Sequence, residues 1–95
     1  MSIWGSLQGC ISFNAAGPRP SLKTIAGTLQ DEFGCEMLLR VFSNDTENSI
    51  TVVKFRLAFD EEGRRANKIV DTFLDQLDKW KGVEYDITSE TRHSK

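Results

Sequence analysis

The sequence predicts an α+β sandwich in which helices cover one face of a β-sheet. Residues 50–59 alternate between apolar and polar side chains, and the apolar set on one face of this predicted strand is Val53, Phe55, Leu57 and Phe59. An acidic turn at residues 60–63 leads into a predicted helix with one apolar stripe, made of Ala66, Ile69, Val70, Phe73, Leu77 and Trp80. Since the strand and the helix each have one apolar side, we expect these two sides to pack together.

The chain begins with a second predicted strand, at residues 2–13. One phase of this strand contains the apolar residues Ile3, Leu7, Ile11 and Phe13. Gly5 and Gly9 share that phase, which predicts either the close approach of a helix or a bulge in the strand.

A loop and a helix follow this strand. Residues 14–20 predict the loop, because Pro18 and Pro20 prevent regular pairing. Ser21 or the residue beside it predicts the helix N-cap, and Gly34 predicts the end of the helix. The predicted buried stripe of this helix is Leu22, Ile25, Ala26, Leu29 and Phe33.

The middle of the chain predicts a hairpin and the start of the second helix. Residues 35–42 predict a strand, and the polar residues 43–49 predict the loop that leads to strand 50–59. Asp60 predicts the N-cap of the second helix, with Glu61 and Glu62 adding negative charge near the positive end of the helix dipole.

The C-terminal end predicts one more strand. Lys79 and Lys81 suit the C-terminus of the second helix, and Gly82 predicts its end. Residues 83–88 predict a strand that alternates Val83, Tyr85 and Ile87 with polar residues, and residues 89–95 predict a frayed polar tail.

The resulting element order is β-α-β-β-α-β. Right-handed crossovers on a short antiparallel sheet favour the ferredoxin-like sandwich, with strand order 4-1-3-2 and both helices on one face. We expect one domain that spans residues 1–95, since this length allows one hydrophobic core.

Composition excludes several classes of function. The formal net charge is −2, which gives no electrostatic reason to expect a nucleic acid as partner. No apolar run approaches the ~18–20 residues that a membrane span requires, and residues 1–5 lack the features of a secretory signal. We therefore expect a cytoplasmic protein.

Cys10 and Cys35 fall in opposite phases of strands that are not neighbours, so we expect two free thiols.

Residues 5–10, Gly-Ser-Leu-Gln-Gly-Cys, resemble the acylphosphatase signature G-x-V-Q-G-V, and that family shares the same element order. The resemblance covers six residues and implies a phosphate-cradling loop. The family pattern continues with an arginine that grips the acyl phosphate, where this chain has Phe13, and its catalytic asparagine has no counterpart in residues 52–59. Without both groups the charge stabilisation is missing, although Arg19 in the following loop is a possible substitute.

An RNA-recognition module is the other alternative with this topology. Such modules stack bases on aromatic side chains of the uncovered sheet face. In the predicted register the phenylalanines of strand 50–59 lie in the core phase instead. Reversing that register would bury Lys54 and Arg56 beneath the helices, which is costly.

Catalytic and metal-binding constellations do not emerge from the sequence. The chain has one histidine, His93, in the predicted tail, with no second ligand at a recognisable spacing. Asp71, Asp75 and Asp78 have the spacing of a solvated helix face. We therefore expect no cofactor, no metal and no enzymatic activity.

The uncovered sheet face is the best candidate site. Aromatic, aliphatic and arginine side chains among polar ones are typical of protein-binding surfaces. We expect a small inhibitor or regulator of a larger protein complex, such as a phage-encoded blocker or an immunity-type protein, with a homodimer through the same face as a further possibility. The predicted partner-binding residues are Trp4, Leu38, Arg40, Phe42, Lys54 and Arg56. The loops at residues 17–19 and 43–49 remain alternative contact sites.

Overall fold

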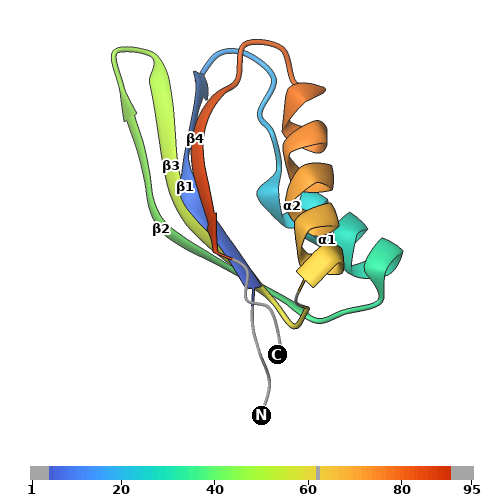
Figure 1. The fold of residues 1–95 in the computed structure, drawn as a ribbon. Coiled ribbons are helices and arrows are strands. Elements are labelled where there is room, and N and C mark those ends of the chain that lie inside the picture. The colour runs from blue at the N-terminus through green and yellow to red at the C-terminus, as the bar shows by residue number, and fades with distance from the viewer. Residues whose placement is uncertain (1–4, 62, 91–95) are drawn as a thin grey trace.

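The computed structural model describes residues 5–61 and 63–90, which form one antiparallel sheet and two helices (Figure 1). The elements are β1 (Gly5–Asn14), α1 (Leu22–Phe33), β2 (Met37–Glu47), β3 (Ile50–Phe59), α2 (Gly63–Asp78) and β4 (Glu84–Glu90). The strand order β2-β3-β1-β4 is the predicted order read from the opposite edge. Both helices lie on the same side of the sheet (Figure 1). The ferredoxin-like prediction is therefore confirmed.

The core lies between the helices and the sheet, where the predicted apolar faces meet. The rings of Phe55 in β3 and Phe73 in α2 are 5.7 Å apart, and both side chains are fully buried. Contacts between aromatic rings at this separation stabilise a core beyond the area that they bury. Trp80, which we predicted as part of the α2 stripe, lies beyond the last residue of the helix and is only partly buried.

The ends of α1 follow the prediction. The hydroxyl of Ser21 accepts a hydrogen bond from the backbone N–H of Thr24 at 3.2 Å. Gly34 has a left-handed φ of 65° and donates its N–H to the carbonyl of Gln30 at 2.8 Å. Both contacts satisfy backbone groups that a helix end leaves unpaired.

The turn at residues 60–63 predicts the start of α2 to within one residue, but the predicted N-cap and end of this helix were wrong. The helix begins at Gly63, so Asp60 lies too early to be its N-cap, and the Asp60 N–H donates instead to the carbonyl of Glu36 at 3.3 Å. Glu61 forms an ion pair with Arg65 at 2.9 Å. Arg65 also donates to the backbone carbonyl of Phe33, which ties the first turn of α2 to the last turn of α1. The helix ends at Asp78, four residues before Gly82.

The predicted loop at residues 43–49 was also wrong. β2 runs to Glu47, and Asn48 and Ser49 alone form the turn, with φ values of 53° and 67°. Two consecutive residues with positive φ are typical of the tight turn that matches the twist of a β-hairpin. The hydroxyls of Thr46 and Thr51 face each other across the hairpin at 2.8 Å.

The two glycines of β1 are tightly packed, although a helix is not what approaches them. Gly5 lies against the ring of Phe59 in the adjacent strand. Gly9 lies against the backbone of Asp86 and Ile87 in β4. Close strand contacts therefore explain the small residues at both positions.

The remaining predictions concern the ends of the chain and the cysteines. Ser89 and Glu90 belong to β4 rather than to a frayed tail, whereas residues 2–4 and 91–95 lie outside the described part of the chain. Cys10 and Cys35 are free thiols, as predicted. Within the described ranges, neither helix is both long and apolar enough to cross a bilayer.

Candidate functional site: the open sheet face

The open sheet face is the side of the sheet that faces away from α1 and α2. Strand pairing aligns its side chains into four rows that run from β2 through β3 and β1 to β4. The rows are Leu38-Ala58-Ser6-Glu90, Arg40-Arg56-Gln8-Thr88, Ser43-Lys54-Cys10-Asp86 and Asp45-Val52-Ser12-Glu84. Of the six predicted partner-binding residues, this face contains all but Trp4, which lies outside the described residues.

Phe42 reaches the open sheet face through a β-bulge. The pairing of β2 with β3 shifts between Val41 and Ser43, so Phe42 has no direct partner in β3. A bulge places two residues opposite one and redirects the side chain at that point. The Phe42 side chain is 60% exposed, and Leu38 on the same strand is 55% exposed. Two large apolar groups therefore lie in solvent on one edge strand.

Arg40 lies directly opposite Arg56 in the adjacent strand. Like charges at directly opposed positions destabilise a sheet. Neither arginine forms an ion pair with a described residue. We therefore expect the pair to lower the stability of the isolated domain, and it gives this part of the open sheet face a concentrated positive charge.

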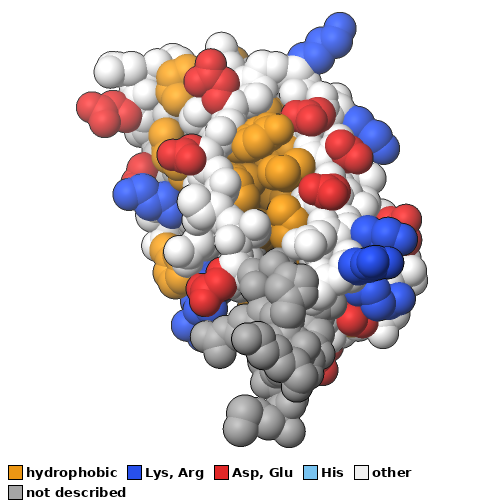
Figure 2. All heavy atoms as spheres, viewed as in Figure 1, with side chains coloured by type: hydrophobic (Ala, Val, Ile, Leu, Met, Phe, Trp, Pro, Cys, Tyr) orange, Lys and Arg blue, Asp and Glu red, His pale blue; other side chains and the backbone are white. Residues whose placement is uncertain are grey.

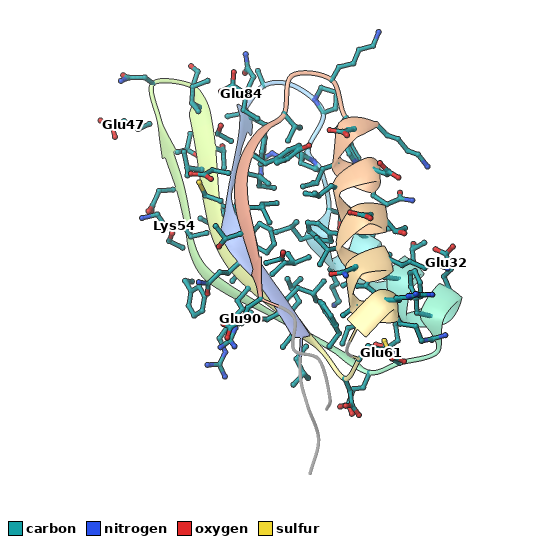
Figure 3. All side chains as sticks on the ribbon, viewed as in Figure 1. Glu32, Glu47, Lys54, Glu61, Glu84 and Glu90 are labelled. Atoms are coloured by element: carbon teal, nitrogen blue, oxygen red, sulfur yellow. The ribbon has the colours of Figure 1, made fainter. Side chains whose placement is uncertain are left out.

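Charge is distributed unevenly across this face. The cations Arg40, Arg56 and Lys54 come from β2 and β3, whereas Glu84 and Asp86 come from β4 at the opposite edge. Figure 3 shows Lys54 on the side of the sheet away from the helices, and Glu84 near one end of β4. The surface is therefore basic around Arg40, Arg56 and Lys54 and acidic along β4, and Asp45 adds a carboxylate at the hairpin end of β2.

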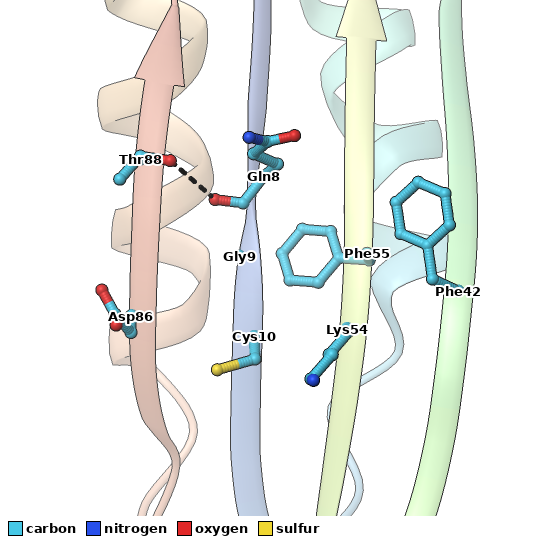
Figure 4. Close-up of a pocket in the computed structure, with 8 residues that line it drawn as sticks. All are labelled: Gln8, Gly9, Cys10, Phe42, Lys54, Phe55, Asp86 and Thr88. Atoms are coloured by element: carbon cyan, nitrogen blue, oxygen red, sulfur yellow. Dashed lines mark hydrogen bonds between the residues drawn. The ribbon is translucent and has the colours of Figure 1, made fainter.

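A shallow hollow of about 350 Å³ lies near the centre of the open sheet face (Figure 4). Three consecutive residues of β1, Gln8, Gly9 and Cys10, are part of its lining. Phe42, Lys54, Asp86 and Thr88 are also part of its lining, and the Thr88 hydroxyl lies 3.4 Å from the carbonyl oxygen of Gln8. The hollow offers an apolar ring, a cation and a carboxylate to an incoming group.

The acylphosphatase-like motif lies within a strand. Residues 5–10 are part of β1 and pair with β3 throughout and with β4 from Ser6 onward. Their backbone N–H groups therefore belong to a sheet and not to a loop. Phe13, at the position of the family's arginine, is buried in the core. Arg19 lies on the other side of the sheet, in a groove beside α1.

The described strands lack the aromatic platform of an RNA-recognition module. The phenylalanines of β1 and β3, which are Phe13, Phe55 and Phe59, are all buried beneath the helices. Lys54 and Arg56 are exposed on the open side, as the predicted register required.

Reactive groups are sparse in the described part of the chain. No cluster of three or more metal-ligating side chains occurs between residues 5 and 90, with residue 62 left aside. His93 lies outside the described residues. Partial burial raises the pKa of the Cys35 thiol, and the nearby Glu61 carboxylate raises it further. This thiol is therefore less reactive than an ordinary cysteine, because the thiolate is the nucleophile.

Two further apolar surfaces were not predicted from the sequence. One is the groove beside α1, which is lined by Val41 of β2 among other residues. The other is visible in Figure 2, where hydrophobic side chains lie between β4 and α2 with acidic side chains on either side. Tyr85 of β4 is 38% exposed and donates a hydrogen bond to Asp78 of α2 at 2.9 Å. Period-two alternation marks Val41 and Tyr85 as inward, but alternation alone cannot show where a helix fails to cover the sheet.

Comparisons with known proteins bear on the fold. No protein-family model and no curated protein matches the sequence. Among solved structures, the de novo designed protein Foldit4 is similar, with a TM-score of 0.62, 13% identity, and coverage of 95% of this chain and 99% of Foldit4. A putative glycine cleavage system transcriptional repressor has a TM-score of 0.55 and 14% identity over 99% of this chain and 50% of that one. The fold is ferredoxin-like. At these identities the likeness establishes nothing about activity.

Proposed function

We propose that this domain works by binding another protein through the open sheet face. The observation that carries the proposal is the directly opposed pair Arg40 and Arg56, which lies beside the exposed side chains of Leu38 and Phe42. An arrangement that costs stability in the free domain is readily explained if a partner neutralises the charge and covers the apolar groups.

The same residues define the chemistry of the partner. Arginine and aromatic side chains are enriched at the energetic centres of protein interfaces. A complementary surface would present carboxylates to Arg40 and Arg56 and an apolar pocket to Phe42. The acidic β4 edge of a second copy also carries carboxylates, so a two-fold homodimer is the alternative within this proposal.

We also propose that the domain is not an enzyme. The position of residues 5–10 inside a paired strand supports this, because the motif offers no loop to cradle a phosphate. A non-catalytic cytoplasmic inhibitor or regulator of a larger complex fits a small domain of this kind. Its origin as an immunity-type or phage-encoded protein stays a prediction.

Affinity capture from the source organism tests this function. The bait is the full chain, and both proteins and nucleic acids that copurify are identified. We expect a protein partner that withstands nuclease treatment. Recovery of RNA or a nucleotide with no protein would contradict the proposal and favour a nucleic-acid or ligand-binding module. Turnover of an acyl phosphate that Arg19→Ala abolishes would contradict its non-catalytic part.

A further inference from the structure

A second concave surface lies on the opposite side of the sheet from the open face. This groove has a volume of about 570 Å³ and lies between the start of α1 and the β2–β3 hairpin. Small-molecule sites typically measure about 300–1,000 Å³. Its apolar lining includes Ile11, Phe13, Leu22, Leu39, Val41 and Val53.

The groove exists because α1 does not cover the part of the sheet that lies next to the hairpin. The chain leaves β1 at Asn14, crosses a loop, and enters α1 only at Leu22. β2 meanwhile continues to Glu47, so the hairpin extends past the region that α1 covers (Figure 1). Val41 is 48% exposed although it is paired with the buried Phe55 on the core side. The exposed apolar area of Val41 is therefore part of the groove wall.

The charge at the groove is entirely positive. Arg19 and Lys23 are both part of its lining, and none of its lining residues is an aspartate or a glutamate. This local excess occurs in a chain whose formal net charge is −2. Asn44 adds an uncharged amide. An occupant that matches this lining has an apolar body and a single anionic end.

The loop at the rim is held in place by hydrogen bonds. The Ala15 N–H donates to the carbonyl of Ser49 in the hairpin turn at 2.8 Å. The Ala16 N–H donates to the Asn14 side chain at 2.9 Å, and the Gly17 N–H donates to the Asn14 carbonyl at 3.0 Å. These bonds fix the first part of the loop, residues 14–17, which leads to the groove residues Arg19 and Pro20, and this reduces the conformational entropy that the loop can lose when a ligand binds.

We propose that this groove binds a small amphipathic carboxylate, such as a medium-chain fatty acid. Its apolar chain lies against Leu39, Val41 and Val53, and its carboxylate lies near Arg19 and Lys23. This site is separate from the open sheet face, so one can exist without the other.

Calorimetric titration of the full chain with decanoate, below its micellar concentration, tests the proposal. We expect saturable binding, with amide chemical-shift changes at the groove residues and weaker binding of the neutral analogue decanol and of acetate. The double variant Arg19→Gln/Lys23→Gln should bind decanoate about three- to tenfold more weakly, as expected for two exposed ion pairs. Its affinity should also depend less on salt, because screening acts on the charged contact. Equal affinity for decanol and decanoate, or no saturable binding, would overturn the proposal.

Val41 and Phe42 provide a matched pair of variants. They are consecutive residues of β2 with exposures of 48% and 60%, and they line the groove and the open-face hollow respectively. Val41→Asp places a carboxylate in the groove and should weaken decanoate binding by about tenfold or more. Phe42→Asp adds the same charge on the other face of the sheet and should leave the affinity for decanoate unchanged. An equal loss in both variants, with both folded by circular dichroism, would show that decanoate binds elsewhere.

Discussion

Gly9 of β1 lies so close to Asp86 of β4 that a Cβ at Gly9 would overlap the Asp86 carbonyl oxygen. The same Cβ would lie 2.8 Å from the Cα of Ile87. Both contacts involve backbone atoms, which cannot move without separating the two strands. A side chain at Gly9 would therefore push β4, the edge strand next to β1, away from the sheet.

Gly9→Ala should destabilise the domain. The added methyl group forces β4 away from β1, and overpacking of this kind typically costs about 1–3 kcal/mol. Thermal unfolding followed by circular dichroism measures the change. Loss of amide protection confined to β4 and its neighbours in hydrogen exchange would locate the effect. An unchanged midpoint would show that β4 is not packed against β1 as described.

Gly27→Ala should have the opposite effect. Gly27 lies inside α1, and a Cβ there would meet no atom within 4 Å. Glycine in a helix interior is less favourable than alanine by about 1 kcal/mol. The midpoint of thermal unfolding should therefore rise, and a fall would indicate that this part of α1 is not helical.

The titration of Tyr85 should report its contact with Asp78. Its hydroxyl donates to the Asp78 carboxylate, and this hydrogen bond, with the negative charges of Asp78 and Asp75, raises the pKa of Tyr85 above its ordinary value of about 10. The contact stabilises the fold fully below the ordinary pKa, and this contribution is lost as the pH rises through the raised pKa. The chain has one tyrosine, so its ultraviolet titration is unambiguous. Asp78→Asn should lower the midpoint, and an unchanged midpoint would refute the contact.

Arg40→Gln should raise the stability of the free domain. Removing one of two opposed like charges relieves a repulsion worth roughly 0.2–1 kcal/mol. Salt screens the same repulsion, so the gain should shrink at high ionic strength. Arg64→Gln, at an exposed position of α2, is the control and should lack this salt-dependent gain. A loss of stability in Arg40→Gln would mean that Arg40 makes a favourable contact.

The sequence was sufficient to predict the order of the elements, because apolar periodicity is strong in β1, β3 and both helices. It failed at the β2–β3 hairpin for two physical reasons. The bulge between Val41 and Ser43 interrupts the alternation, and the polar residues 43–47 extend into solvent, where a strand needs no apolar face. The sequence also favoured Asp60 as the N-cap of α2, although the helix begins only at Gly63, since acidic residues suit several positions near a helix start.

The open sheet face was predicted as a surface, because period-two alternation places Arg40, Lys54 and Arg56 away from the helices. The direct opposition of Arg40 and Arg56 required the register, which alternation alone does not determine. The groove beside α1 required the position of the helix over the sheet. Arg19, Asn44 and Val41 are distant in sequence and line one groove only in the folded chain.

The affinity of the captured partner for Phe42→Ala and Arg40→Ala tests the central proposal most directly. Both side chains are exposed, so neither truncation removes core packing. Truncating an interface hot spot typically costs about 2 kcal/mol or more, which is about a 30-fold loss of affinity. We predict losses of this size while the unfolding midpoint falls in neither variant. Normal binding by both variants, combined with loss of binding on mutation of residues 43–49 or 17–19, would contradict the open sheet face as the contact surface.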